Sequence, residues 1–360
     1  MGSMGESVQL QFQDPVIVKL SDVERQSGRM SEENVAAAVI AFHRDGFIVL
    51  ENVVDPMHCD ILDAEMCLKA ERMAKDPKTI WNDNLHAPKE KRSGNMQHAP
   101  PLRPEVMYED IWANKLTATI LSCILGPNPS CNFADGNTAL GDGYGGRQTV
   151  HADMAYNFPS MPCTITANYY LEDASAANGS TELWLGSARD STFRDHKACR
   201  DAGPEDDVLR PKKISLHTED DNYAMEANFG VRPDVLEARR KFAPPVQPSV
   251  KKGGVMLRDL RLWHAGIANP SSKTRIMLNF IYTPWWYKCP TKINLPEEAR
   301  PLAEAWASRK DHPIVLQTRY FPTEAECKAQ QFGIDFSSRN PSYWKSLDNS
   351  LIAGYTFIDE

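Results

Sequence analysis

The chain has 360 residues, of which 42% are hydrophobic and 24% are charged, and its formal net charge is −8. This composition is typical of a soluble globular protein, and the acidic balance argues against nucleic acid as a partner, because nucleic-acid binding needs a basic face. No apolar run approaches the roughly 20 residues of a membrane helix, and the N-terminus has no secretory pattern. The eight cysteines include no Cys-x-x-Cys pair, so we expect an intracellular, cytoplasmic protein with reduced thiols.

The first third of the chain carries helical patterns around one short strand. Ser31 can cap a helix that Gly46 would end. Pro104 fits the first turn of a later helix, which Gly126 would stop. The predicted elements are a polar, irregular arm at 1–30, a helix at 31–44, a strand at 47–50, a helix from about 56, a long loop at 77–103 and a helix at 104–125.

From residue 131 the pattern changes to strands and turns, which predicts an α+β fold or a β-barrel with a helical side layer. A charged stretch at about 190–250 is interpreted as an insertion between strands, because apolar residues are sparse there. We therefore expect the arm at 1–30, a single domain at 31–290 with this insertion, and a C-terminal extension at 291–360 packed on the same domain. The predicted elements are strands at 131–140, 147–153, 162–171, 181–185, 254–264 and 274–283, and a helix at 297–308.

A candidate metal-binding pair, His151 and Asp153, lies on one of these strands. Residues i and i+2 of a strand point to the same face, so the pair can direct one imidazole and one carboxylate at a single point. With His264 from a second strand, the pair would form a facial triad of the kind that binds non-haem Fe(II) with open positions. Taken alone, the pair equally fits a solvated ion pair on a surface strand, because the chain has nine histidines.

Arg275, in the last predicted strand, is a candidate anion-binding residue that shares a face with Met277 and Asn279. An arginine on the interior face of a strand is costly unless it is paired. The planar guanidinium is suited to bidentate contact with a carboxylate. A small dicarboxylate would be such a partner, and a structural glutamate would be another.

Together these motifs resemble the phytanoyl-CoA dioxygenase family of Fe(II)/2-oxoglutarate-dependent oxygenases, in particular its fungal natural-product branch. The likeness covers about residues 35–285, and several ordered motifs make it more specific than any one of them. One turn departs from the family pattern Pro-Gly-Ser-His and is Leu185-Gly186-Ser187-Ala188 in this chain. The matching motifs are Gln148, His151-Ala152-Asp153, Asn178-Gly179-Ser180-Thr181, Gly186-Ser187, His264-Ala265-Gly266, Asn269-Pro270-Ser271 and Arg275.

The resemblance implies a fold and a metal centre. The fold would be mainly β, a double-stranded β-helix (a cupin-like jelly-roll barrel) flanked by the N-terminal helices. His151, Asp153 and His264 would ligate Fe(II) and form the catalytic centre. Because related halogenases leave the carboxylate position to chloride, Asp153 argues against halogenation.

The resemblance also implies 2-oxoglutarate as cosubstrate and O₂ as oxidant. Arg275 would pair with the distal carboxylate of 2-oxoglutarate, and Gln148 and Thr181 would help to hold it. The expected reaction is hydroxylation, desaturation or oxidative rearrangement at an unactivated C–H bond, with release of succinate and CO₂. The expected substrate is a small, largely hydrophobic biosynthetic intermediate.

Two other functional classes stay open at this stage. A metal-dependent hydrolase or isomerase on the same barrel would hold Zn²⁺ at the triad and would not require Arg275. A non-catalytic barrel would act as a binding protein. Trp285, Trp286 and Tyr287 would line the mouth of the barrel or would be core or interface residues. The insertion would be a lid or a contact in a homodimer.

Overall fold

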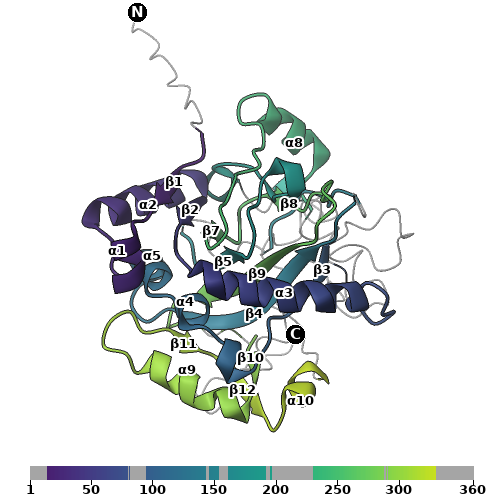
Figure 1. Ribbon diagram of the computed structural model, residues 1–360. Coiled ribbons are helices and arrows are strands. Elements are labelled where there is room, and N and C mark those ends of the chain that lie inside the picture. Colours follow the sequence, from purple (N-terminus) through teal and green to yellow (C-terminus); the bar gives the residue numbers. More distant parts are fainter. Residues whose placement is uncertain are drawn as a thin grey trace, which may run out of the picture.

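The computed structural model is built around a mixed sheet of eight strands, with a two-stranded sheet in a second layer (Figure 1). It describes residues 14–79, 81, 95–142, 146–153, 161–191, 195–196, 230–287, 289 and 291–329. The order in the main sheet is β1 (Ile17–Lys19), β2 (Phe47–Glu51), β7 (Val255–Asp259), β5 (Ile165–Tyr170), β9 (Arg275–Thr283), β4 (Ser130–Ala139) and β11 (Val315–Leu316), and β3 (Asn95–Gln97) also pairs with β4.

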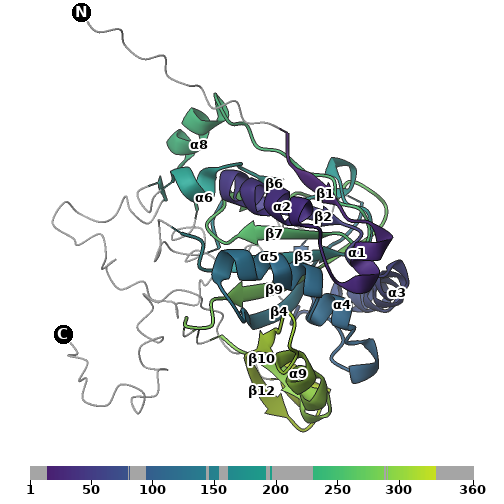
Figure 2. The same ribbon diagram turned by 90° about the vertical axis from the view of Figure 1, so that its left-hand side faces the viewer.

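One face of the main sheet packs on the N-terminal helices. In the register of the sheet, Tyr169 is paired with both Leu278 and Val255, and all three belong to the core shared with those helices. Their neighbours Tyr170 and Met277 belong to a separate cluster on the opposite face. This alternation follows from the two-residue period of a strand. The main helices of this layer are α2 (Glu32–Asp45), α3 (Pro56–Met73) and α5 (Lys115–Leu125) (Figure 2).

The other face of the main sheet lies toward the second layer. That layer contains β6 (Glu182–Leu183) antiparallel to β8 (His264–Ala265), and residues 146–153 run beside β8. Sheet, second layer and helices form the α+β double-stranded β-helix that the sequence predicted. No helix in the described part of the chain is long and apolar enough to cross a membrane.

The N-terminal arm is more ordered than the sequence predicted. Its residues Ile17–Lys19 form β1, which pairs in parallel with β2, and α1 (Asp22–Ser27) follows. Glu24 joins α1 to α2, because one carboxylate oxygen accepts from Ser21 in a capping box and the other accepts from the backbone N–H of Ser31. The expectation of an irregular arm was therefore wrong for this stretch, because its polar side chains serve as helix caps.

The predicted helix at 104–125 is broken into three pieces. A 3₁₀ turn at Pro104–Val106 and the short helix α4 (Glu109–Trp112) precede α5. The side chain of Asn114 accepts from the backbone N–H of Thr117 at 2.8 Å and starts α5 as a new helix. A residue that caps one helix has non-helical backbone angles, so it interrupts the continuous helix that periodicity suggested.

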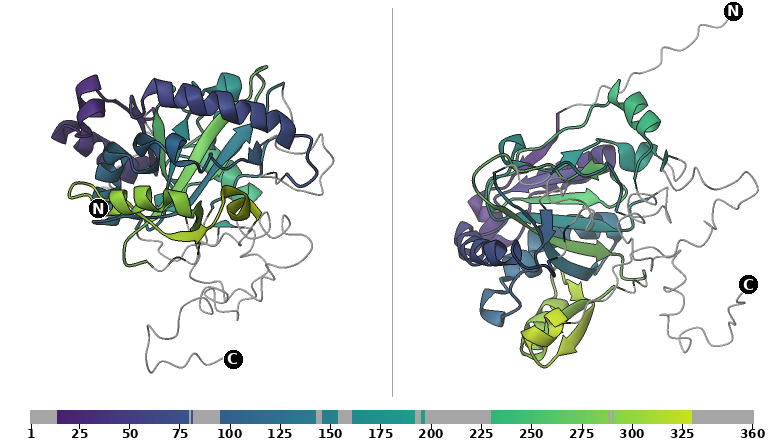
Figure 3. Two further views of the ribbon diagram at one scale, coloured as in Figure 1. Left: turned by 60° about the horizontal axis from the view of Figure 1, so that its bottom comes forward. Right: turned by 90° about the vertical axis from the view of Figure 1, so that its right-hand side faces the viewer.

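The C-terminal part packs against the edge of the main sheet formed by β4 (Figure 3). It supplies β11 to that sheet and adds a parallel pair, β10 (Ile293–Pro296) and β12 (Thr318–Phe321). The helix α9 (Arg300–Ala307), preceded by a 3₁₀ turn at Glu297–Ala299, matches the helix predicted at 297–308. The final described element is α10 (Glu324–Ala329).

The fully buried His98 leads to a prediction about stability and pH. Burial, with Lys69 and Lys328 nearby, lowers the pKa of His98 to about 3. The unfolded chain takes up this proton near pH 6.5 and the folded chain does not, so stability falls as pH drops below 6.5. We expect the native protein to lose about 2 kcal/mol more than His98→Asn between pH 8 and pH 5. Urea unfolding at both pH values measures this, and equal losses in the two proteins would contradict it.

Candidate metal centre

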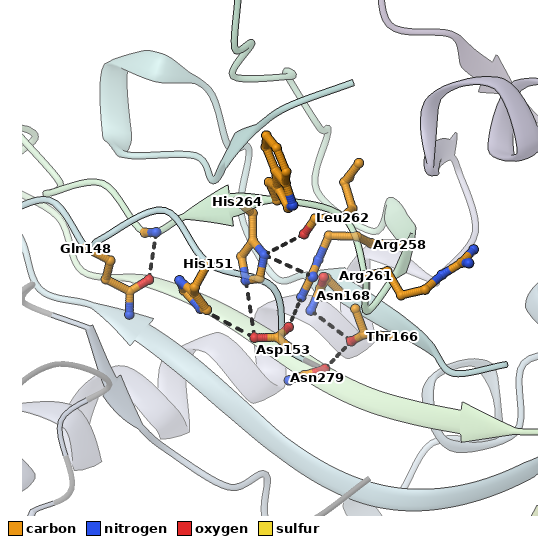
Figure 4. A network of polar contacts seen from close by, with 12 residues as sticks. Gln148, His151, Asp153, Thr166, Asn168, Arg258, Arg261, Leu262, His264 and Asn279 are labelled. Atoms are coloured by element: carbon orange, nitrogen blue, oxygen red, sulfur yellow. Dashed lines mark hydrogen bonds and ion pairs between the residues drawn. The ribbon is translucent and has the colours of Figure 1, made fainter. Parts of the chain in front are cut away.

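His151, Asp153 and His264 meet at one point, as the sequence predicted (Figure 4). Their ligand atoms all lie within 4.8 Å of one another. Oδ1 of Asp153 is 3.4 Å from Nε2 of His151 and also 3.4 Å from Nε2 of His264. Ligand atoms at about 2.1 Å from a shared ion and at right angles are about 3 Å apart, so this spacing suits a metal ion.

The triad is built by backbone pairing between two distant segments. His151 and His264 exchange hydrogen bonds, with N···O distances of 3.0 and 2.9 Å. On either side, Gln148 N donates to Gly266 O and Asp153 N donates to Leu260 O. The pairing register between the two segments changes from one of these contacts to the next. The prediction of a regular strand at 147–153 is therefore wrong, and His151 forms isolated β-bridges instead. The alternation of side chains nevertheless survives around His151.

The two residues that flank His151 in the chain point away from the triad. Val150 and Ala152 are buried in a cluster with Trp184 and Trp263, behind the triad. The helix α8 (Pro233–Arg240) packs on the same cluster through partly buried apolar side chains. The C-terminal end of the predicted insertion therefore packs on the apolar cluster next to the triad. The parts of the insertion at 192–194 and 197–229 lie outside the described residues.

The imidazole of His151 has a tautomer that suits a metal ligand. Its Nδ1 is 2.8 Å from the carbonyl oxygen of Thr149, which only accepts, so Nδ1 carries the proton and Nε2 keeps its lone pair. Nδ1 of His264 lies between an acceptor, the carbonyl oxygen of Leu262 at 3.0 Å, and a donor, Nη1 of Arg258 at 3.2 Å.

Charge in the centre also suits a divalent cation. Burial, followed by the nearby charge of Arg258, lowers the pKa of His264 to about 4. Burial alone would raise the pKa of Asp153, but its contacts with His264 and Arg258 hold that pKa well below its usual range. At neutral pH the centre therefore combines a neutral imidazole at His264 with a carboxylate at Asp153, which are donors that Fe(II) accepts.

Arg258 is a buried neighbour of the triad that the sequence analysis missed. Its Nη2 donates to Oδ2 of Asp153 at 2.6 Å, and its Nη1 is 3.2 Å from Nδ1 of His264. The sequence did contain a signal, because Arg258 directly follows the apolar run Val255-Met256-Leu257. An arginine that is buried with such a run needs a buried partner. Nothing local indicated that the partner would be a ligand 105 residues away.

The sheet beneath the triad is polar. Thr166 donates to the side chain of Asn279 on the neighbouring strand, and Nδ2 of Asn168 is 3.4 Å from the hydroxyl of Thr166. Figure 4 shows these three side chains close to the carboxylate of Asp153. A bound molecule that extends below the metal would therefore meet amide and hydroxyl groups.

Arg275 is buried on β9 and is not part of an ion pair with a described carboxylate. Its Nε donates to Asn178 O at 3.2 Å and its Nη2 donates to Gly179 O at 2.9 Å. Its Nη1 is buried and has no hydrogen-bond partner among the described residues. An orphaned guanidinium nitrogen in a protein interior is costly. The structural Arg–Glu pair considered above is therefore ruled out within these residues, and an anionic ligand fits the position.

Thr181 and Gln148 have different surroundings. Burial raises the pKa of Tyr170, and the nearby charge of Arg275 and the side chain of Thr181 act in the opposite direction. Gln148 uses its side-chain oxygen to accept from the backbone N–H of Gly266 at 2.7 Å, which fixes the orientation of its amide. Tyr170 was not a sequence candidate, because tyrosines in apolar strands usually belong to the core.

Gly266, the glycine of the His-x-Gly motif, leads to a second prediction. A Cβ at this position would meet the side-chain oxygen of Gln148 at 2.6 Å, so Gly266→Ala must displace that amide. If Gln148 contacts 2-oxoglutarate, the KM for 2-oxoglutarate rises about tenfold, the effect of losing one hydrogen bond to a charged group. Steady-state assays measure this. Gly146→Ala is the matched control, because its Cβ has no atom within 4 Å, and equal KM values would refute the prediction.

The turn Leu185-Gly186-Ser187-Ala188, which departs from the family pattern, is held by a hydrogen bond to its serine. Gly186 has a positive φ of 72°, and the hydroxyl of Ser187 accepts from the backbone N–H of Trp263 at 2.9 Å.

Trp285 and Trp286 are exposed, so they are not core residues, whereas Tyr287 is buried.

Comparison with known proteins places this geometry in a family. The sequence model of the family phytanoyl-CoA dioxygenase (PhyH) matches residues 42–277. The chain is similar to the structure of EctD from S. alaskensis with bound Fe, with 18% identity, a TM-score of 0.48, and coverage of 81% of this chain and 88% of that chain.

It is also similar to the carbocyclase SnoK from nogalamycin biosynthesis, with 17% identity, a TM-score of 0.45, and coverage of 71% of this chain and 84% of that one. These likenesses are too distant to assign a reaction or a substrate. The family match, in contrast, spans more than half of the chain and includes the whole triad and Arg275. The chain therefore belongs to the phytanoyl-CoA dioxygenase family and is an Fe(II)- and 2-oxoglutarate-dependent dioxygenase.

Proposed function

We propose that His151, Asp153 and His264 are the ligands of Fe(II) in this dioxygenase. Their convergence and the fixed tautomer of His151 support this assignment. A triad of two histidines and one carboxylate leaves three positions for the cosubstrate and O₂.

Arg275 binds the distal carboxylate of 2-oxoglutarate in this proposal. The observation that carries it is the buried Nη1, which has no hydrogen-bond partner among the described residues, on a guanidinium that otherwise donates to the backbone carbonyls of Asn178 and Gly179. A carboxylate would satisfy that nitrogen and neutralise the buried charge. Thr181, through Tyr170, and Gln148, beside Gly266, help to hold the cosubstrate.

The substrate in this proposal is a small, largely hydrophobic biosynthetic intermediate. With 2-oxoglutarate and O₂, bound iron supplies the oxidising power for hydroxylation, desaturation or oxidative rearrangement of an unactivated C–H bond, with release of succinate and CO₂. The exposed Trp285 and Trp286, just past β9, offer flat surfaces for an apolar substrate. The carboxylate at Asp153 argues against halogenation.

The organisation of the chain is proposed as follows. Residues 31–290 form one oxygenase domain with an insertion at about 190–250, and residues 291–360 belong to an extension on it, of which 330–360 lie outside the described residues. The protein acts in the cytoplasm on a small molecule without nucleic acid or membrane as partner, and a homodimer is the oligomeric state to be tested. Light scattering of the purified protein tests the last point.

The experiment that tests the function is an anaerobic titration. Fe(II) and then 2-oxoglutarate are added to metal-free protein, and the visible spectrum is recorded. We expect a weak charge-transfer band that needs both additions, because it reports 2-oxoglutarate chelated to the iron. A folded protein that binds one Fe(II) and gives no band would overturn the proposed site.

A further inference from the structure

Arg258 connects the two layers of the barrel at the metal centre. It comes from β7 in the main sheet, whereas Asp153 and His264 come from the opposite layer (Figure 4). The arginine is only 5% exposed, and its Nη2 lies 2.6 Å from Oδ2 of Asp153. A buried ion pair of this kind is not needed for the fold, because apolar side chains fill such positions at least as well.

The two oxygens of Asp153 have different surroundings. Oδ1 is 3.4 Å from the Nε2 atoms of both His151 and His264, so it faces the place of the metal. Oδ2 faces Arg258 and is held by a charge-assisted hydrogen bond. Carboxylates bind metal ions through one oxygen or through both. The guanidinium occupies the oxygen that two-oxygen binding would require.

The number of oxygens matters for a facial triad. Three positions stay open when the carboxylate contributes one oxygen, and a chelating cosubstrate together with O₂ needs all three. A second oxygen from Asp153 would occupy one of them and compete with the cosubstrate.

We propose that Arg258 is a positioning residue that restricts Asp153 to metal binding through Oδ1 alone. The inference rests on the proposed assignment of the triad to the metal. Arg258 acts through the carboxylate in this role, without direct contact with substrate, and its Nη1 is also 3.2 Å from Nδ1 of His264. Without it, Oδ2 turns toward the metal and the cosubstrate binds more weakly.

The test uses Co(II) in place of Fe(II), because the visible bands of Co(II) change with its number of ligands. Metal-free full-length protein, Arg258→Met and Arg258→Lys are titrated with Co(II) and then with 2-oxoglutarate. Arg261→Lys is the matched control, because Arg261 is equally buried three residues away and pairs with Asp259 instead of a ligand. Circular dichroism and thermal melts confirm that each variant is folded.

We expect the Co(II) spectrum of Arg258→Met to differ from that of the native protein before 2-oxoglutarate is added. The affinity for 2-oxoglutarate should then fall about 10- to 100-fold, the range seen when partners of metal ligands are removed. Arg258→Lys keeps a donor for Oδ2 and should restore much of both properties, and Arg261→Lys should match the native protein.

A folded Arg258→Met with the native Co(II) spectrum and native 2-oxoglutarate affinity would overturn the proposal. If Arg258→Lys were as impaired as Arg258→Met, loss of the hydrogen bond to Oδ2 would not explain the weaker binding of 2-oxoglutarate. That result would also count against the proposal. If the native Co(II) protein does not respond to 2-oxoglutarate, the proposed function fails. The comparison of Co(II) spectra still decides the role of Arg258 in that case.

Discussion

His264→Ala is expected to abolish Fe(II) binding at the triad and to reduce succinate release to background. The remaining pair, His151 and Asp153, provides two protein ligands instead of three, and both lie on one short segment. The substitution also removes Nε2 of His264, which lies 3.4 Å from Oδ1 of Asp153. Iron content after anaerobic loading and succinate formation with 2-oxoglutarate are the two measurements.

The control for this variant is His196→Ala. His196 is also buried and packs edge-on against Trp263, at 6.4 Å between ring centroids, but it is not a member of the triad. Iron binding and succinate release should be retained in that variant if it folds. A folded His264→Ala protein that binds a full equivalent of iron, or turns over at a substantial fraction of the native rate, would remove His264 from the ligand set.

Arg275→Met is expected to leave Fe(II) binding intact and to weaken 2-oxoglutarate binding severely. Methionine is unbranched and about as long as the arginine side chain up to Nε, so the variant fills much of the same space and loses the charge that would pair with the distal carboxylate. Truncating one partner of a buried charge pair costs about 2–5 kcal/mol, which corresponds to a roughly 30-fold to several thousand-fold loss of affinity. Titration of the anaerobic Fe(II) protein with 2-oxoglutarate, followed through its visible band, measures this loss.

Arg275→Lys separates the effect of charge from the effect of geometry. Lysine keeps the positive charge but lacks the planar fork of donors, so intermediate affinity is expected. Iron content is the internal control, because Arg275 contacts backbone carbonyls at Asn178 and Gly179 and none of the three ligands. A 2-oxoglutarate affinity that is unchanged in a folded Arg275→Met protein would show that the cosubstrate binds elsewhere.

Much of the candidate site was predictable from residue types and their spacing. The i, i+2 relation places His151 and Asp153 on one side of the chain, and this relation holds although the segment is not a regular strand. Two motif glycines also have local reasons. Gly179 has φ 74°, and an added Cβ at Gly266 would collide with Gln148. Such constraints act over a few residues, so a sequence pattern records them.

The element boundaries were less predictable, for an equally physical reason. Periodicity indicates which residues are apolar, but it does not reveal where a side chain will cap a helix instead of continuing it. Asn114 therefore divided a helix that the pattern predicted as one, and Glu24 ordered a segment that looked irregular. In both cases a hydrogen bond between a polar side chain and the backbone competed with the average propensity of the segment.

The family, the residues expected to bind the metal and the α+β class could be predicted from the sequence, because they depend on ordered motifs and local periods. The surroundings of these residues follow from the way the chain folds in three dimensions. The contact of Arg258 with Asp153 and the orphaned Nη1 of Arg275 depend on how two layers of the barrel face each other. Arg258 and Asp153 lie 105 positions apart in the chain. The energy of a buried charge depends on its partners in space, and no local sequence pattern specifies those partners.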